Sequence, residues 1–297
     1  MVRSVILSAV LLASATACTA ETPDDVQTAD QAEQASAMNG SDWRTIDPEN
    51  LIQMETPHGS VTIELNSDFA PKHVERFRTM VRDQIYNGER FYRVIDGFVA
   101  QAGLQDETRI ATFEPLVNEN DRPLSNADFI PLGNRDLFAP EVGHIDSFAV
   151  GRSTELGQEW LLHCPGVLAM ARDTDPDTGG TEFYITLAPQ RYLDRNLTVF
   201  GRVIDGMPAL QKLKRGVRAI ESGVIQAPDQ GDKILRMHVV SDQPEKDRGV
   251  WQVQAMPSAA FDAAKTAKRV REEAFFYRKP PEILDICGFE VPVQKIE

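Results

Sequence analysis

The segment GERFYRVIDGFVAQAG, residues 88–103, places Arg93 between an aromatic and a β-branched neighbour, followed by Gly-Phe and a lone glutamine. An arginine that pointed into the interior of a plain strand would be a buried charge with a high free-energy cost. Arg93 therefore either faces solvent or is held in a cleft, where it has a chemical task. A guanidinium is planar and always charged, so it suits chemistry that forms no covalent bond.

Metal, nucleophile and phosphate chemistry have little support. The five histidines form no His-x-x-x-His pair, and Glu141 with His144 is only a weak match to a metal-ligand spacing. The sequence contains no Gly-x-Ser-x-Gly elbow and no phosphate-binding glycine loop. We therefore expect no metal site and no cofactor.

The acidic stretch DTDPDTGGTEFY, residues 173–184, is the one candidate calcium loop. Its three aspartates occupy the first ligand positions of an EF-hand. However, Thr178 stands where glycine is required and Tyr184 where the bidentate glutamate should be. We interpret the stretch as a turn, and keep a calcium-dependent structural module as a weaker alternative.

Composition limits the partners. The 297 residues carry a net charge of −14, with an isoelectric point near 4.9. Nucleic-acid binding needs clustered Lys and Arg, so nucleic acid is not an expected partner. A hydrophobic content of 42% is enough for a folded core.

The elements around Arg93 are mostly strands. Residues 51–65 alternate on both sides of a Pro-His-Gly-Ser turn and predict a β-hairpin. Residues 70–88 predict an amphipathic helix with Pro71 in its first turn. Further strands are predicted in 166–172, 181–187, 197–206 and 232–242. A short helix is predicted in 207–214. A longer helix is predicted in 257–278, with Ser258 as a possible cap. Residues 106–162 are expected to be long loops with short elements. This pattern favours a β-barrel or sandwich.

The N-terminus has the features of an export signal. Arg3 precedes an apolar run over residues 5–17 that is too short to span a bilayer. The run ends in ATAC, residues 15–18, which resembles a bacterial lipobox; an ordinary cleaved signal peptide with an incidental Cys18 is the alternative. We expect a signal over 1–18 with lipidation at Cys18, a disordered tether over 19–47, and a protein held at the periplasmic face of a bacterial membrane.

Two cysteines remain after Cys18. In an oxidising compartment Cys164 and Cys287 could form a disulfide. A buried free cysteine is an equally ordinary state, so the sequence leaves both possibilities open.

Four motifs carry a family resemblance. FYRVIDGFVAQAG, GVLAMAR, GGTEFYITL and YLDRNLTVFGRVIDGM occur in this order within residues 51–241. They are similar to motifs of the cyclophilin-type peptidyl-prolyl cis-trans isomerases. The resemblance implies a mainly β fold: a closed antiparallel eight-stranded β-barrel capped by two helices, over 48–243. It also marks 106–162 as a long loop insertion and 244–297 as a C-terminal extension, which we expect to pack on the barrel through Trp251, Phe275, Phe276 and Tyr277.

The resemblance also implies a mechanism and a substrate. Amide resonance sets a barrier of about 18–20 kcal/mol for rotation about a prolyl bond. Arg93 would donate a hydrogen bond to the proline nitrogen in the twisted state, and Gln101 would orient Arg93 and bind substrate backbone. Proline-containing polypeptides are the implied partners. The implied substrate-binding residues are Phe98, Val99, Ala171, Arg172, Glu182, Tyr184, Tyr192 and Leu193.

The chain departs from the family pattern at two of these positions and at Leu197. Tyr192 replaces a frequent tryptophan, Leu197 a frequent histidine, and Glu182 the usual glutamine. A carboxylate near Arg93 could hold the guanidinium by a salt bridge or divert it from substrate. We expect modest attenuation, so that Glu182→Gln raises activity. The alternative function is a weakly catalytic or non-catalytic module that binds proline segments as a chaperone or scaffold.

Overall fold

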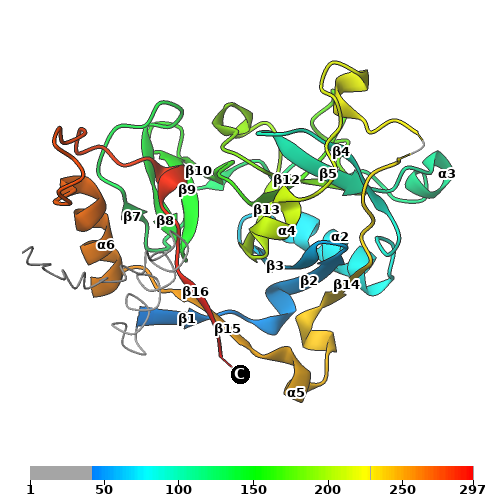
Figure 1. Cartoon of the computed structure of the whole chain (residues 1–297), viewed down its shortest axis with the longest axis horizontal. Helices are drawn as coiled ribbons and strands as arrows, with labels where there is room; N and C mark the ends of the chain where they lie inside the picture. The colour runs from blue at the N-terminus through cyan, green and yellow to red at the C-terminus, as the bar shows by residue number, and fades with distance from the viewer. Residues whose placement is uncertain (1–41, 228, 297) are drawn as a thin grey trace, which may run out of the picture. The chain divides into compact units, whose positions relative to one another are not determined.

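The computed structural model describes residues 42–227 and 229–296 (Figure 1). Every described residue belongs to one compact unit, residues 39–297. The predicted signal, Cys18 and most of the predicted tether lie outside the described residues. The tether was predicted to extend to residue 47, but strand β1 (Trp43–Thr45) pairs with a C-terminal strand, so this boundary is corrected. None of the described helices is long and apolar enough to cross a membrane.

An antiparallel eight-stranded sheet forms the main body, in the order β14-β2-β3-β13-β11-β12-β5-β4. The sheet does not close through its edge strands: β4 meets residues 232–234, just before β14, through isolated backbone hydrogen bonds such as Phe91 N to Asp232 O (2.8 Å), and not through a strand ladder. The predicted closed barrel is therefore corrected to a curled, open half-barrel. The strands are β2 (Leu51–Thr56), β3 (Gly59–Leu65), β4 (Arg90–Val94), β5 (Val99–Gly103), β11 (Val167–Met170), β12 (Glu182–Thr186), β13 (Val199–Asp205) and β14 (Arg236–Val239).

The concave face of this sheet is covered by helices. The predicted hairpin forms as β2 and β3. Helix α2 (Pro71–Arg82) buries Val74, Phe77 and Val81 in the core of the sheet, as its apolar stripe predicts. It ends six residues earlier than predicted. The short helix α4 (Met207–Gln211) adds Ala209 and Leu210 to the same core.

The insertion is a second sheet and not the predicted loops. Five strands pair in the order β6-β10-β9-β8-β7. Asp146 and Ser147 join β8 to β9, and both have positive φ, as a tight two-residue hairpin turn requires. This Asp-Ser turn lacks the usual glycine, which is why the hairpin was missed. The strands are β6 (Arg122–Pro123), β7 (Ile130–Pro131), β8 (Glu141–Ile145), β9 (Phe148–Ser153) and β10 (Gln158–Leu161).

The C-terminal extension forms a three-stranded sheet with the start of the described chain, in the order β1-β15-β16. The predicted cap is present, because Ser258 accepts a hydrogen bond from Phe261 N at the start of α6, which ends at Val270 and not at the predicted 278. The elements are α5 (Glu245–Arg248), β15 (Val250–Gln254), α6 (Ala259–Val270) and β16 (Val293–Ile296). The remaining short helices are α3 (Glu107–Ile110), η2 (Pro48–Asn50), η3 (Arg191–Leu193), η4 (Glu221–Gly223), η5 (Val240–Asp242) and η6 (Ile286–Gly288).

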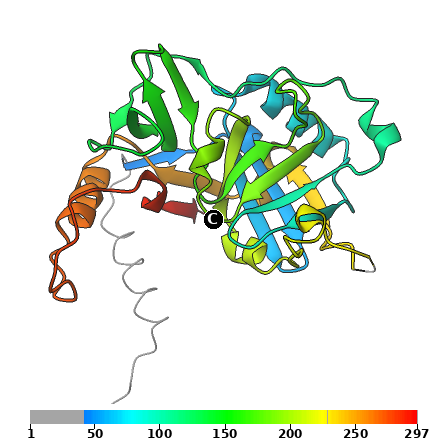
Figure 2. The same ribbon diagram turned by 90° about the horizontal axis from the view of Figure 1, so that it is seen from above.

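A second apolar core joins the extension, the inserted sheet and the outer face of the main sheet. Phe261 of α6 packs against His144 of β8, with ring centroids 5.4 Å apart, and Figure 2 shows α6 beside the inserted sheet. Cys164 and Cys287 form a disulfide across this core. Trp251 is buried as expected, but Phe275 and Tyr277 are 84% and 88% exposed, so that part of the packing prediction is wrong. They follow the end of α6 and do not reach the core.

Candidate active site

The site residues form a row across three adjacent strands. Arg93 of β4 pairs with Gln101 of β5, and Gln101 pairs with Tyr184 of β12. Directly paired residues of antiparallel strands point to the same face of a sheet. The intervening side chains, such as Ala100 and Phe183, point to the opposite face and into the main core. The sheet therefore separates its packing residues from the candidate site by simple alternation.

A β-bulge adds Tyr92 to this row. The register of β4 against β5 shifts between Arg90, which pairs with Gly103, and Arg93, which pairs with Gln101. The bulged strand has one extra residue, so Tyr92 and Arg93 reach the same face although they are neighbours. Both side chains accordingly hydrogen-bond to the Gln101 side chain.

The Arg93 guanidinium is fixed on two sides. Its Nη1 donates to Gln101 Oε1 (3.0 Å) and its Nε donates to the carbonyl of Ser222 (2.8 Å). Its central carbon lies 5.5 Å from the centroid of the Phe98 ring. None of the described residues accepts a hydrogen bond from Nη2, so this donor is free for a bound molecule.

Glu182 acts on Gln101 and not directly on Arg93. Its carboxylate accepts hydrogen bonds from Tyr92 Oη, from Gln101 Nε2 (3.0 Å) and from Gln105 Nε2 (3.3 Å). Among residues 42–227 and 229–296, no ion pair joins it to Arg93, so the salt bridge that the sequence left open as one alternative is absent. A carboxylate is only an acceptor, so it turns the Gln101 NH₂ toward itself and leaves Oε1 for Arg93.

Two physical features hold this network together. Burial, and next the negative charge of Glu182, raise the pKa of Tyr92 well above its usual range, which keeps the phenol a neutral donor.

Gly103 lets β5 approach β12 beside Glu182. A Cβ at Gly103 would lie 2.6 Å from Glu182 Cα, and its φ of +140° also favours glycine.

An apolar surface adjoins the polar network. Val99 and Tyr184 belong to the second core, and Phe98, Ala171 and Leu197 pack against its edge. Tyr184 is 5% exposed, and its hydroxyl is 2.9 Å from His163 Nε2. Burial raises the pKa of Tyr184 well above its usual range, so this phenol also stays neutral.

The remaining predicted residues are less closely associated. Arg172 is bonded to two loops: its Nη1 donates to Asp173 O (2.6 Å) in its own loop, and its Nη2 donates to Asn196 O (2.7 Å) after η3. Tyr192 is 58% exposed and Leu193 is half-buried, both on η3. The structure thus groups Arg93, Gln101 and Glu182 tightly, with Phe98, Val99, Ala171 and Tyr184 alongside.

Sequence reasoning missed three members of the site. Tyr92 is part of the FYR motif, but only a bulge brings it beside Arg93. His163 is marked only by its position next to Cys164. Ser222 contributes a backbone carbonyl from a loop where Glu221 and Ser222 both have positive φ, and no side-chain pattern signals this role.

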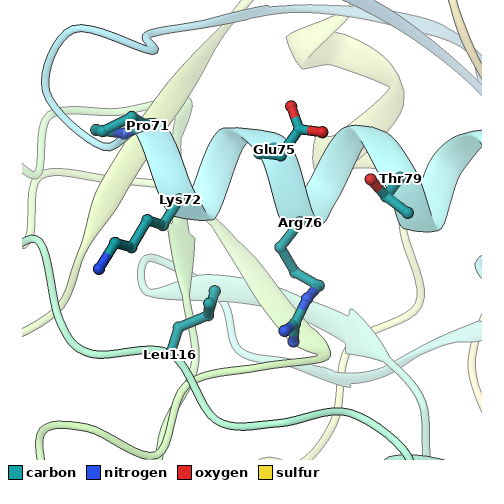
Figure 3. A pocket seen from close by; sticks show the side chains of 6 residues that line it. All are labelled: Pro71, Lys72, Glu75, Arg76, Thr79 and Leu116. Atoms are coloured by element: carbon teal, nitrogen blue, oxygen red, sulfur yellow. The ribbon is translucent and has the colours of Figure 1, made fainter.

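Two other features lie outside this site. Figure 3 shows a surface pocket of about 400 Å³ along α2, where Arg76 extends toward Leu116, and its lining includes none of the predicted site residues. In the candidate calcium loop, Asp177 Oδ1 accepts hydrogen bonds from the Asn118 backbone (2.9 Å) and side chain (2.7 Å). Within the described ranges, no three His, Cys, Asp or Glu side chains are grouped as metal ligands.

Comparison with known proteins decides the family. Residues 51–239 match the family described as cyclophilin type peptidyl-prolyl cis-trans isomerase/CLD. This chain belongs to the cyclophilin family. The match covers all eight strands of the main sheet, from the start of β2 to the end of β14, and it includes Arg93, Gln101 and Glu182. The chain is therefore a cyclophilin-type peptidyl-prolyl cis-trans isomerase, which confirms the enzyme class expected from the four motifs.

Named relatives agree. A probable peptidyl-prolyl cis-trans isomerase of Brucella suis is 32% identical over 198 residues, covering 66% of this chain and 85% of that protein. A peptidyl-prolyl cis-trans isomerase of Acinetobacter baylyi is 28% identical over 199 residues, covering 64% of this chain and 86% of that protein. The crystal structure of cyclophilin AquaCyp293 from Hirschia baltica matches with a TM-score of 0.69 and 26% identity, covering 94% of this cyclophilin and 100% of that chain. The structural match therefore extends beyond residues 51–239.

Proposed function

We propose that Arg93 is the catalytic residue and that it acts by donating a hydrogen bond from Nη2 to the nitrogen of a substrate proline. Rotation about the prolyl bond breaks amide conjugation and returns a lone pair to that nitrogen. A donor already fixed in place stabilises this twisted state more than the planar one, which is the requirement for catalysis. Proline-containing segments are the substrates.

The free Nη2 carries the proposal. Gln101 and Ser222 use Nη1 and Nε, so the guanidinium is preorganised while one donor stays available. Phe98, Val99 and Tyr184 supply an apolar surface beside it, on which a proline ring could lie. No step needs a nucleophile or a metal.

The alternative function is a module that binds proline segments with little catalysis. Replacing Arg93 separates the two. We expect Arg93→Ala to lower kcat/KM by about 10²–10³-fold, the usual effect of removing one preorganised donor. The measurement is a protease-coupled isomerisation assay on an Ala-Pro tetrapeptide, with peptide binding followed by calorimetry.

Arg218→Ala is the matched control. The Arg218 guanidinium carbon lies 5.6 Å from the centroid of the same Phe98 ring, and within the described part of the chain no hydrogen bond joins it to Gln101. It should change kcat/KM by less than roughly threefold, because it removes a charge and not the positioned donor. Wild-type protein that binds proline peptides yet does not accelerate isomerisation would establish the binding module instead.

We further propose that this cyclophilin is exported and lipid-anchored through Cys18, and that its substrates are exported proteins. The lipobox-like ATAC and the disulfide between Cys164 and Cys287 support this, because disulfides persist in oxidising compartments. We expect the wild-type chain in the membrane fraction with a lipid mass on Cys18, and Cys18→Ser in the soluble fraction. Identical fractionation of both chains would contradict the anchor.

A further inference from the structure

Three exposed apolar side chains lie on η3 and on the loop that Arg191 ties to it. Leu137 is 95% exposed, Phe138 52% and Tyr192 58%. Leu137 and Phe138 precede β8 of the inserted sheet, and Tyr192 lies on η3. We propose that these residues, here called the apolar shelf, bind an apolar side chain of the substrate next to its proline. The proposal rests on the proposed function and extends it to substrate preference.

The loop that bears the shelf is fixed to η3. Asp136 Oδ1 accepts hydrogen bonds from the backbone N–H groups of Phe138 (2.9 Å) and Ala139 (3.0 Å). The same carboxylate accepts hydrogen bonds from both terminal nitrogens of Arg191, at 2.9 and 3.1 Å. Arg191 is 7% exposed, and its guanidinium carbon lies 5.4 Å from the Phe138 ring centroid. A partly buried, bidentate ion pair therefore sets the two halves of the shelf in a defined position.

The shelf is connected to the proposed proline surface. Arg191 Nε donates to Asp194 Oδ2 (2.6 Å), and Asp194 Oδ1 lies 3.2 Å from His163 Nδ1. His163 Nε2 lies 2.9 Å from the Tyr184 hydroxyl. A continuous chain of hydrogen bonds thus links the loop of Phe138 to Tyr184. Because the same hydrogen-bond chain positions both the shelf and Tyr184 of the proposed proline surface, the polypeptide bound at that surface is the occupant that we assign to the shelf.

Substrate preference tests the shelf. Exchange NMR measures isomerisation of proline pentapeptides that differ only by Leu or Ser, placed two residues before or two residues after the proline. We expect wild type to favour Leu about tenfold in kcat/KM at one of these positions. In the double variant Leu137→Ser, Phe138→Ser this ratio should fall to near one. Both side chains are exposed, and thermal unfolding checks that the variant is folded.

Leu235→Ser is the control, because Leu235 is 51% exposed but lies next to β2 at the other edge of the main sheet. It should keep the wild-type Leu/Ser ratio. An unchanged ratio in the double variant would overturn the proposal. So would concentration-dependent dimerisation that the double variant abolishes, which would assign the shelf to a second copy.

Failure of the proposed function has a different signature. If Arg93 is not catalytic, Arg93→Ala keeps its turnover while the Leu/Ser preference is still lost in the double variant. Calorimetric titration with the same peptides measures the preference even in a chain without turnover. The shelf and the catalytic arginine are therefore tested separately.

Discussion

The two sides of the candidate site are built in different ways. The arginine side consists of Tyr92, Arg93, Gln101 and Glu182. The tyrosine side consists of Tyr184, His163, Asp194, Arg191 and Asp136. The first is half-exposed, and its side chains all come from β4, β5 and β12 of the main sheet. The second is largely buried and depends on the inserted sheet and on η3.

This difference indicates that the arginine side carries the chemistry and that the tyrosine side supports the structure around it. On the arginine side, hydrogen bonds leave one donor open to solvent, as a reacting group requires. On the tyrosine side, both ring nitrogens of His163 have hydrogen-bond partners within the chain, and one of these partners is the Tyr184 hydroxyl. The adjoining disulfide ties Cys164 to the extension. Perturbing the extension should therefore affect stability first, and perturbing the arginine side should affect turnover first.

The largest expected effect in this comparison comes from the disulfide. Cys164 and Cys287 are 123 residues apart, so the bond restricts the unfolded chain strongly. We expect Cys164→Ser with Cys287→Ser to lower the free energy of unfolding by about 2–5 kcal/mol. Denaturant unfolding measures this change. Below the transition, Arg93-dependent turnover should largely remain; a stable double variant without turnover would contradict the separation of the two sides.

His144, which packs against the extension, should contribute to the acid sensitivity of the protein. His144 is buried against Phe261 and Phe289. Burial, and next the positive charge of Arg202, lower the pKa of His144 from 6.5 to about 3. Between these values the unfolded chain binds the proton and the folded chain does not, so stability is complete above pH 6.5 and decreases as the pH falls.

The expected slope is at most about 1.4 kcal/mol per pH unit from this histidine. Unfolding at pH 7.5, 6 and 5 measures it. His144→Gln should reduce the slope, because its amide does not titrate. Equal slopes in both chains would show that groups other than His144 produce the acid sensitivity.

The arginine side was readily predicted from the sequence, and the tyrosine side was not. Arg93, Gln101 and Glu182 lie in two of the four motifs that carry the family resemblance, and that resemblance singled them out. Their contact partner Tyr92 depended on a bulge, which alternation does not reveal. The tyrosine side needs Asp136 to meet Arg191 across 55 residues, from an insertion that resembled loops. Such contacts arise from tertiary packing, and no local pattern encodes them.

The smallest expected effect decides what Glu182 does. The sequence suggested that Glu182→Gln raises activity by releasing Arg93. The structure has the carboxylate on Gln101 Nε2 and Tyr92 Oη, so we expect kcat to fall by roughly threefold, since charge-assisted hydrogen bonds are about twice as strong as neutral ones.

Exchange NMR gives kcat and KM separately for this variant. Gln105→Ala is the control: it removes another donor to the same carboxylate without touching Gln101, and it should leave kcat near wild type. A lower kcat with an unchanged KM in Glu182→Gln alone means that the carboxylate positions Gln101, and through it Arg93. A higher kcat would mean that the negative charge restrains the guanidinium, and the arginine side would then be tuned by attenuation and not by alignment.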